Sequence, residues 1–152
     1  MIAITNGKIY TITDGIISNG TIFIEDGKIT AVGENIAIPP QAEIIDAKGQ
    51  IVTPGFIDVH THLGIDEEIH NTVGDDTNEM TNPNTAELRA IDGLNAYDIG
   101  FRDACQAGVT TVMVTMGSAN VIGGVTCVIK TAGKNLQEMV VVPEAGLKMA
   151  FG

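Results

Sequence analysis

Of the three histidines in the sequence, two stand one residue apart in His60-Thr61-His62, and this pair is the clearest candidate for chemistry. The apolar stretch 56–59 precedes the pair and follows Pro54-Gly55, a pattern that predicts a strand buried on both faces. Side chains two residues apart on a strand share a face, so the two imidazoles could bind one divalent metal ion. Most His-x-His pairs in proteins bind nothing, so the spacing alone leaves both interpretations open.

Three further residues have both a functional and a structural interpretation. Asp58 alternates onto the same strand face as the histidines, where it is either a structural carboxylate or a support for a ligand histidine. His70 lies in the acidic stretch 66–84, as a solvated loop residue or as a contact to substrate or a second metal. Arg89 could bind a substrate carboxylate with two hydrogen bonds, but a helix-surface ion pair is favoured.

Other catalytic arrangements are not supported. Ser118 lacks the G-x-S-x-G context, and no histidine follows it, which argues against a serine triad. Cys105 falls within a helical pattern and is interpreted as a packing residue. The glycines at 117, 123 and 124 are not followed by Gly-Lys-Ser/Thr, so they do not form a phosphate-binding loop.

The charge of the chain excludes some partners. Eight basic and nineteen acidic residues give a formal charge of −11, which disfavours nucleic acid and anionic membrane surfaces. We find neither a secretory signal nor an apolar run long enough to span a membrane. The two cysteines are not in a C-x-x-C spacing and are expected to be reduced, so the cytoplasm is the expected location.

The first part of the chain, residues 1–53, is predicted to be β-rich. Asp26-Gly27 joins two β-rich runs and predicts a hairpin, because both central positions of such a turn need positive φ. Pro39-Pro40 then interrupts regular structure. The predicted strands are 8–12, 21–25, 28–33, 43–46 and 50–53.

From Pro54 onward, residues 54–152 alternate between strand and helix patterns. The polar stretch 66–84 predicts a long loop, and a helix is expected over 85–107, in two pieces near Gly93 and ended by Gly108. This order of strand, helix and strand predicts βαβ units with a parallel sheet. The remaining predictions are strands at 109–115 and 125–129 with a loop at 117–124.

The segment Pro54–Gly64 resembles the signature of the urease-related metal-dependent amidohydrolase superfamily, which includes imidazolonepropionase and dihydroorotase. The lead-in 46–55 and the hairpin 25–29 are similar to the same superfamily, and 107–112 resembles its second barrel strand. The loop 117–124 resembles one in imidazolonepropionase-like and prolidase-like members. The resemblance therefore covers nearly the whole chain in the expected order.

This resemblance implies an α/β fold: the first part of a (β/α)8 TIM-type barrel over 54–152, preceded by a sandwich-type β-rich segment over 1–53. It implies His60 and His62 as metal ligands, with zinc expected first and iron, manganese or nickel as alternatives. In the superfamily the metal polarises a carbonyl group and lowers the pKa of a bound water. The implied activity is hydrolysis of an amide or cyclic amide C–N bond in a small molecule.

A complete barrel of this type needs about 250 residues, and no histidine follows His70. We therefore expect the chain to be the N-terminal portion of an enzyme, inactive in isolation, that forms a homo-oligomer or associates with the rest of the barrel. Some relatives bridge two metals with a carboxylated lysine, but Lys148 comes early for this role and is interpreted as structural. A non-catalytic metal-binding module and a structural or assembly piece remain the alternatives.

Overall fold

The structure is a computed structural model that describes residues 1–151. The chain divides into two compact units, and the boundary in the sequence falls between Pro54 and Gly55. No helix in the described part of the chain is long and apolar enough to cross a membrane.

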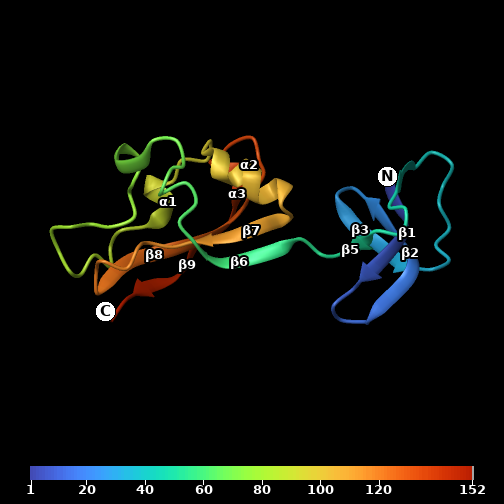
Figure 1. Cartoon of the computed structure of the whole chain (residues 1–152), viewed down its shortest axis with the longest axis horizontal. Coiled ribbons are helices and arrows are strands. Elements are labelled where there is room, and N and C mark those ends of the chain that lie inside the picture. Colours follow the sequence, from blue (N-terminus) through green and yellow to red (C-terminus); the bar gives the residue numbers. More distant parts are fainter. Residues whose placement is uncertain (152) are drawn as a thin grey trace. The chain divides into compact units, whose positions relative to one another are not determined.

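The first unit is a single five-stranded sheet with the order β3-β2-β1-β4, in which β5 also pairs with β1 (Figure 1). The pairs β1–β2 and β2–β3 are antiparallel, whereas β4 and β5 run parallel to β1. The β-rich prediction is therefore confirmed, but the described residues of this unit form one sheet rather than both layers of a sandwich. The strands are β1 (Ile2–Tyr10), β2 (Ile16–Glu25), β3 (Lys28–Gly33), β4 (Glu43–Asp46) and β5 (Ile51–Val52).

The predicted hairpin turn is present between β2 and β3. Asp26 has φ 50° and Gly27 has φ 73°, the left-handed conformation that a two-residue hairpin turn requires. Glu25 pairs with Lys28 directly across the turn. The Asp-Gly dipeptide thus sets the register next to the turn, up to the register shift between Phe23 and Ile24.

The second unit contains a four-stranded sheet of order β6-β7-β8-β9. Only β6 and β7 are parallel, with α2 (Ile99–Gln106) between them in the chain, so the predicted βαβ unit is confirmed there. The pairs β7–β8 and β8–β9 are antiparallel, so the expected run of parallel barrel strands is not formed. The strands are β6 (Phe56–Thr61), β7 (Val109–Val114), β8 (Ile122–Lys130) and β9 (Val140–Met149).

The antiparallel pairing has a simple cause. A parallel crossover needs a dozen or more residues, usually with a helix, whereas β7 and β8 are joined by the short segment 115–121. The segment between β8 and β9 is also short and holds only α3 (Leu136–Met139). The next two strands after the βαβ unit therefore return in antiparallel order.

The expected helix over 85–107 is present as two shorter helices, α1 (Ala90–Gly93) and α2 (Ile99–Gln106). The break after Gly93 and the end of α2 before Gly108, which has φ 91°, agree with the prediction. Most of the polar stretch 66–84 is irregular, apart from the 3-10 turn Asn71–Val73.

The core of the second unit lies between its sheet and its helices, which cover one face of the sheet (Figure 1). Val112, Val114, Cys127 and Ile129 are fully buried on β7 and β8, and Phe101 of α2 packs against this cluster. Each such side chain contributes about 1.5–3 kcal/mol on burial. This packing fixes the carboxyl end of β7, next to which the histidine pair lies.

The prediction that the stretch 56–59 is buried on both faces is wrong for this structure. Phe56 is 59% exposed, and Ile57 and Val59 are each 66% exposed. The reason is that β6 is an edge strand, with β7 as its only neighbour in the described sheet.

Candidate metal centre

The structure brings His60 and His62 together at the carboxyl end of β6. Their rings are perpendicular, with centroids 5.7 Å apart. Both line a pocket of about 400 Å³, and three carboxylates line it with them, those of Asp58, Asp66 and Glu68. Asp66 and Glu68 were not singled out from the sequence, where they are two of many acidic residues in a polar stretch.

The ring of His62 is oriented by the end of the neighbouring strand. Its Nδ1 atom lies 2.8 Å from the main-chain carbonyl oxygen of Thr115. A carbonyl oxygen only accepts hydrogen bonds, so Nδ1 carries a proton, and in the neutral imidazole Nε2 then keeps the lone pair. This arrangement is typical of a metal-ligating histidine, whose second nitrogen donates to a protein oxygen.

Asp58 supports the pair through the main chain. Its Oδ1 accepts a hydrogen bond of 3.0 Å from the backbone N–H of His60. The carboxylate lines the same pocket as both histidine rings. Asp58 therefore holds the backbone of a candidate ligand rather than its imidazole.

The sequence analysis missed the proximity of Lys148, which the structure places beside His60. The Lys148 Nζ atom on β9 lies 3.3 Å from His60 Nε2, so the ammonium group can donate to that ring nitrogen. A metal ion would compete for the same lone pair. No local signal could reveal this contact, because it depends on the pairing of β8 with β9 across 88 residues of sequence separation.

The two glycines of the signature have structural roles. A Cβ atom at Gly55 would overlap the side chain of Thr110 on β7. Gly64 has φ 77°, and a Cβ atom there would lie 2.8 Å from the ring of Phe101. The main-chain carbonyl of His62 accepts hydrogen bonds from the N–H groups of Ile65 and Asp66, at 3.1 and 2.9 Å. Gly64 thus permits a tight turn directly after the histidine pair.

The acidic stretch folds back toward this turn. Asp66 and Asp75 pair in an antiparallel bridge. Hydrogen bonds from the side chain and then the backbone of Thr77 lower the pKa of Asp75, and the nearby His62 contributes in the same direction. The acidic stretch 66–84 therefore places carboxylates, those of Asp66 and Asp75, near the histidine pair.

The structure does not bring His70 or Arg89 into the histidine pocket. The side chain of His70 is 61% exposed, and its Nε2 lies 3.7 Å from the Glu67 carboxylate. Arg89 forms two hydrogen bonds to Asp92, of 2.7 and 2.9 Å, and a longer contact of 3.5 Å to Glu144. The hydrogen bonds from Arg89 lower the pKa of Asp92, and the predicted helix-surface ion pair is confirmed.

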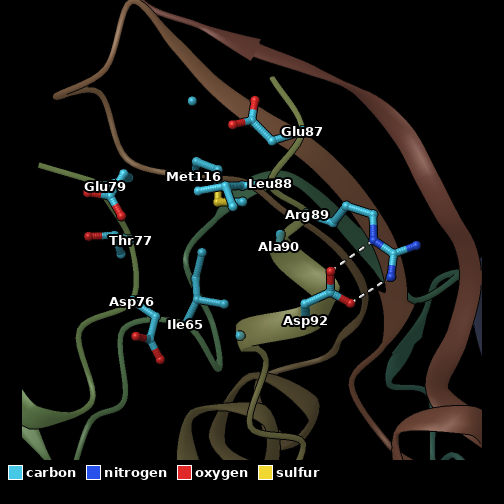
Figure 2. Close-up of a pocket in the computed structure, with 12 residues that line it drawn as sticks. Ile65, Asp76, Thr77, Glu79, Glu87, Leu88, Arg89, Ala90, Asp92 and Met116 are labelled. Atoms are coloured by element: carbon cyan, nitrogen blue, oxygen red, sulfur yellow. Dashed lines mark hydrogen bonds and ion pairs between the residues drawn. The ribbon is translucent and has the colours of Figure 1, made fainter. Parts of the chain in front are cut away.

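Arg89 lines a different pocket, of about 410 Å³. Figure 2 shows Ile65 and Met116 between Asp76 on one side and the Arg89–Asp92 pair on the other. The paired guanidinium of Arg89 is already neutralised by Asp92, as the dashed lines in Figure 2 show. This pocket is therefore not a match for the predicted substrate carboxylate.

The donor atoms of the histidine pocket fit part of a metal site. They include one imidazole with a free Nε2, a second imidazole close to it, and carboxylates on the same pocket wall. Among residues 1–151, however, no three His, Cys, Asp or Glu side chains are grouped closely enough to hold a metal ion by themselves. A structural zinc site has four protein ligands and a catalytic one has three, so further donors would be needed.

Comparison with known proteins finds relatives of one kind. The chain is 37% identical to an amidohydrolase of Hapsidospora irregularis over 116 residues, 74% of this chain and 12% of the relative. It is 47% identical to a dihydroorotase of Aquifex aeolicus over 60 residues, 40% of this chain and 14% of the relative. No model of a known protein family matches the chain.

A solved structure agrees with these relatives. The crystal structure of an amidohydrolase from Thermotoga maritima matches the whole of this chain with a TM-score of 0.93 and 41% identity. The chain spans 39% of that protein, and 12 to 14% of the two curated relatives. On this evidence of sequence and fold, the chain belongs to the amidohydrolase family, of whose members it matches a portion.

Proposed function

We propose that this chain supplies two metal ligands, His60 and His62, to the active site of a hydrolase that cleaves amide or cyclic amide C–N bonds in small molecules. The observation that carries the proposal is the orientation of His62, whose Nδ1 is held by the Thr115 carbonyl and whose ring centroid lies 5.7 Å from that of His60. Relatives named amidohydrolase and dihydroorotase support the reaction class.

The residues around the pair have distinct roles in this proposal. His60 and His62 would hold a divalent metal, with zinc expected first and iron, manganese or nickel as alternatives. When bound, the metal supplies Lewis acidity for the attack of water on the amide. Asp58 holds the backbone of His60, and the pocket of about 400 Å³ suits a small substrate.

Metal binding by the chain itself is the first test. Zinc titration by calorimetry should give one weak site, at which water completes the coordination, and His60→Ala and His62→Ala should each weaken its affinity at least tenfold, about 1.4 kcal/mol. His70→Ala is the matched control, because His70 lies outside the histidine pocket. Equal zinc affinity in the wild type and in the double variant at 60 and 62 would refute the proposed metal role.

Activity is tested in a hybrid protein, in which this chain replaces the matching segment of the Thermotoga amidohydrolase. The hybrid should hydrolyse at least one member of a panel of N-acyl and cyclic amide substrates, and His60→Ala or His62→Ala should abolish turnover. The 152-residue chain alone should be inactive, because its described residues provide too few ligands. Turnover by the chain alone would show that the site is complete.

A second candidate role, in assembly, is favoured by the exposed apolar side chains of β6. Ile57 and Val59 stand on an edge strand with an open row of backbone hydrogen-bonding groups. We infer that these are covered in solution, by a second copy of the chain or by further barrel strands. Sedimentation analysis of the wild type and of Ile57→Lys tests this, and a monomeric wild type would argue against self-association.

We also propose a cytoplasmic location, since Cys105 and Cys127 are both unpaired. Reduced cysteines are the rule in the cytoplasm, whereas secreted domains tend to pair theirs. A fusion to a fluorescent protein, imaged in cells, checks this location, and an extracellular signal would contradict it.

A further inference from the structure

We propose that Asn95 and Asp98, in the turn before α2, are positioning residues for the histidine pair. The inference rests on the proposed metal-binding role of His60 and His62. Neither Asn95 nor Asp98 lines the histidine pocket, so both would act through the chain segment that follows His62.

The turn 95–98 is joined to the segment 64–68 by three hydrogen bonds. The backbone N–H of Asn95 donates to the Gly64 carbonyl at 2.8 Å. The Asn95 side-chain amide donates to Glu67 Oε2 at 3.0 Å, and the backbone N–H of Glu68 donates to Asp98 Oδ1 at 3.3 Å. The segment 64–68, which opens the first βα loop, is thus fixed at its beginning, middle and end.

These contacts reach His62 through its main chain. The carbonyl of His62 accepts the N–H groups of Ile65 and Asp66, which lie inside the clamped segment. The ring of His62 is held independently by the Thr115 carbonyl. His62 is therefore fixed at two points, its ring by β7 and its backbone by the turn before α2. Ligand side chains must be held to within about 0.5 Å of productive geometry, which requires both points.

The surroundings of Asp98 indicate that its side chain holds the segment 64–68 rather than the start of α2. Asp98 is 6% exposed, and its Oδ2 has no hydrogen-bond partner among the described residues. Its side chain makes no capping hydrogen bond to α2, although it occupies the N-cap position. A buried carboxylate oxygen without a partner costs free energy. Among the described residues, the side-chain hydrogen bond of Asp98 is the one that its Oδ1 accepts from the Glu68 N–H.

The position of Oδ2 suggests a decisive variant. A Cβ atom added at Gly100 would lie 3.2 Å from Asp98 Oδ2 and 2.9 Å from Glu68 Oε1, so both oxygens face the same gap. Asp98→Asn keeps the acceptor for the Glu68 N–H and places an amide donor near the Glu68 carboxylate. Asp98→Ala removes the acceptor altogether.

The experiment compares Asp98→Ala, Asp98→Asn and Asn95→Ala in the full chain. One readout is the Co²⁺ affinity and the absorption spectrum of the bound Co²⁺. The other is hydrogen exchange of the Ile65 and Asp66 amides without metal. Arg102→Ala is the matched control, because this residue lies on α2 with its side chain 65% exposed.

We expect Asp98→Ala and Asn95→Ala to weaken Co²⁺ binding about tenfold, the lower end of the effect of outer-shell changes at metal sites. Amide exchange at 65 and 66 should accelerate in both variants, and Asp98→Asn should restore both properties. Unchanged affinity and exchange in Asp98→Ala would overturn the proposal, as would an Asp98→Asn variant as impaired as Asp98→Ala.

Two further outcomes are separable. If the wild type binds no Co²⁺, the proposed function fails, and the amide exchange still decides whether the turn fixes the His62 backbone. If Asp98→Ala does not fold, Asn95→Ala decides by the same two readouts, because its backbone bond to Gly64 is retained.

Discussion

His62 and Thr115 are joined by a contact of 2.8 Å between the ring Nδ1 and a main-chain carbonyl oxygen. Thr115, which directly follows β7, also donates its N–H to the carbonyl of Thr61, at 2.9 Å. The ends of β6 and β7 are therefore tied together at the histidine pair. This contact gives His62 two roles that can be separated, one in stability and one in metal binding.

Replacement of His62 by asparagine should separate the two roles. The side-chain amide introduced by His62→Asn can donate to the Thr115 carbonyl in place of Nδ1, but it has no counterpart of Nε2. We expect this variant to keep the wild-type melting temperature and to lose zinc affinity as fully as His62→Ala. His62→Ala should in addition lose about 1 kcal/mol of stability with the hydrogen bond. Calorimetric melting and zinc titration check both, and zinc affinity retained in His62→Asn would contradict the ligand role.

Local patterns were sufficient to predict much of the fold. The hairpin at Asp26-Gly27, the strand before His60 and the helix end at Gly108 each depend on a few adjacent residues, and all are present. The His-x-His spacing likewise predicts two neighbouring imidazoles, which the structure places 5.7 Å apart.

Pairing between distant segments could not be predicted in the same way. The antiparallel return of β8 and β9 depends on connection length and on which faces find partners, and neither is encoded by a short motif. Lys148 was interpreted as structural because it comes early in the chain for a metal-bridging lysine, although β9 places it beside His60. The exposure of Ile57 likewise depends on which strands are present at the sheet edge.

Lys148 should weaken metal binding, because its ammonium group competes for the lone pair of His60 and repels a cation. Lys148→Met should raise zinc affinity by up to about tenfold, the scale of one unit-charge interaction at this distance in bulk water, because the contact is exposed. Lys134→Met removes the same charge from an exposed position and is the control. The opposite result would contradict this prediction. If Lys148→Met lowers zinc affinity, and if the zinc affinity of the wild type depends on added bicarbonate, Lys148 is instead a carboxylated ligand.

Gly64 should not tolerate a side chain. Gly64→Ala combines positive φ with a contact of 2.8 Å to the Phe101 ring, so we expect a loss of about 2–4 kcal/mol in the free energy of unfolding. Gly108→Ala is the control in the same unit, because its φ is 91° but its nearest contact is an ordinary 3.6 Å. Urea unfolding measures both variants, and equal losses would show that the Phe101 contact is unimportant.

Acid should weaken the first unit through Asp46. The side-chain amide of Asn6 and then the backbone N–H of Lys48 hydrogen-bond this carboxylate and lower its pKa below the ordinary 3.8. Because the pKa of Asp46 is lower in the folded state, this carboxylate stabilises the folded state at pH values above its unfolded-state pKa of 3.8. This contribution is lost as the pH falls from 3.8 through the folded-state pKa. The urea midpoint, followed by circular dichroism between pH 5 and pH 2.5 (about the range of carboxylate titration), should fall less steeply in Asp46→Asn. Identical pH profiles would show that this carboxylate does not contribute.

The two thiols should differ sharply in reactivity. Cys127 is fully buried, and burial raises the pKa of its thiol to about 11, whereas Cys105 is partly exposed on α2. Because the thiolate is the reactive form, iodoacetamide at neutral pH should alkylate Cys105 in the native chain and leave Cys127 unmodified. Peptide mass spectrometry reads out the sites, and the urea-unfolded chain, in which both should react, is the control. Alkylation of native Cys127 at a rate comparable to Cys105 would show that the core between the sheet and α2 opens readily.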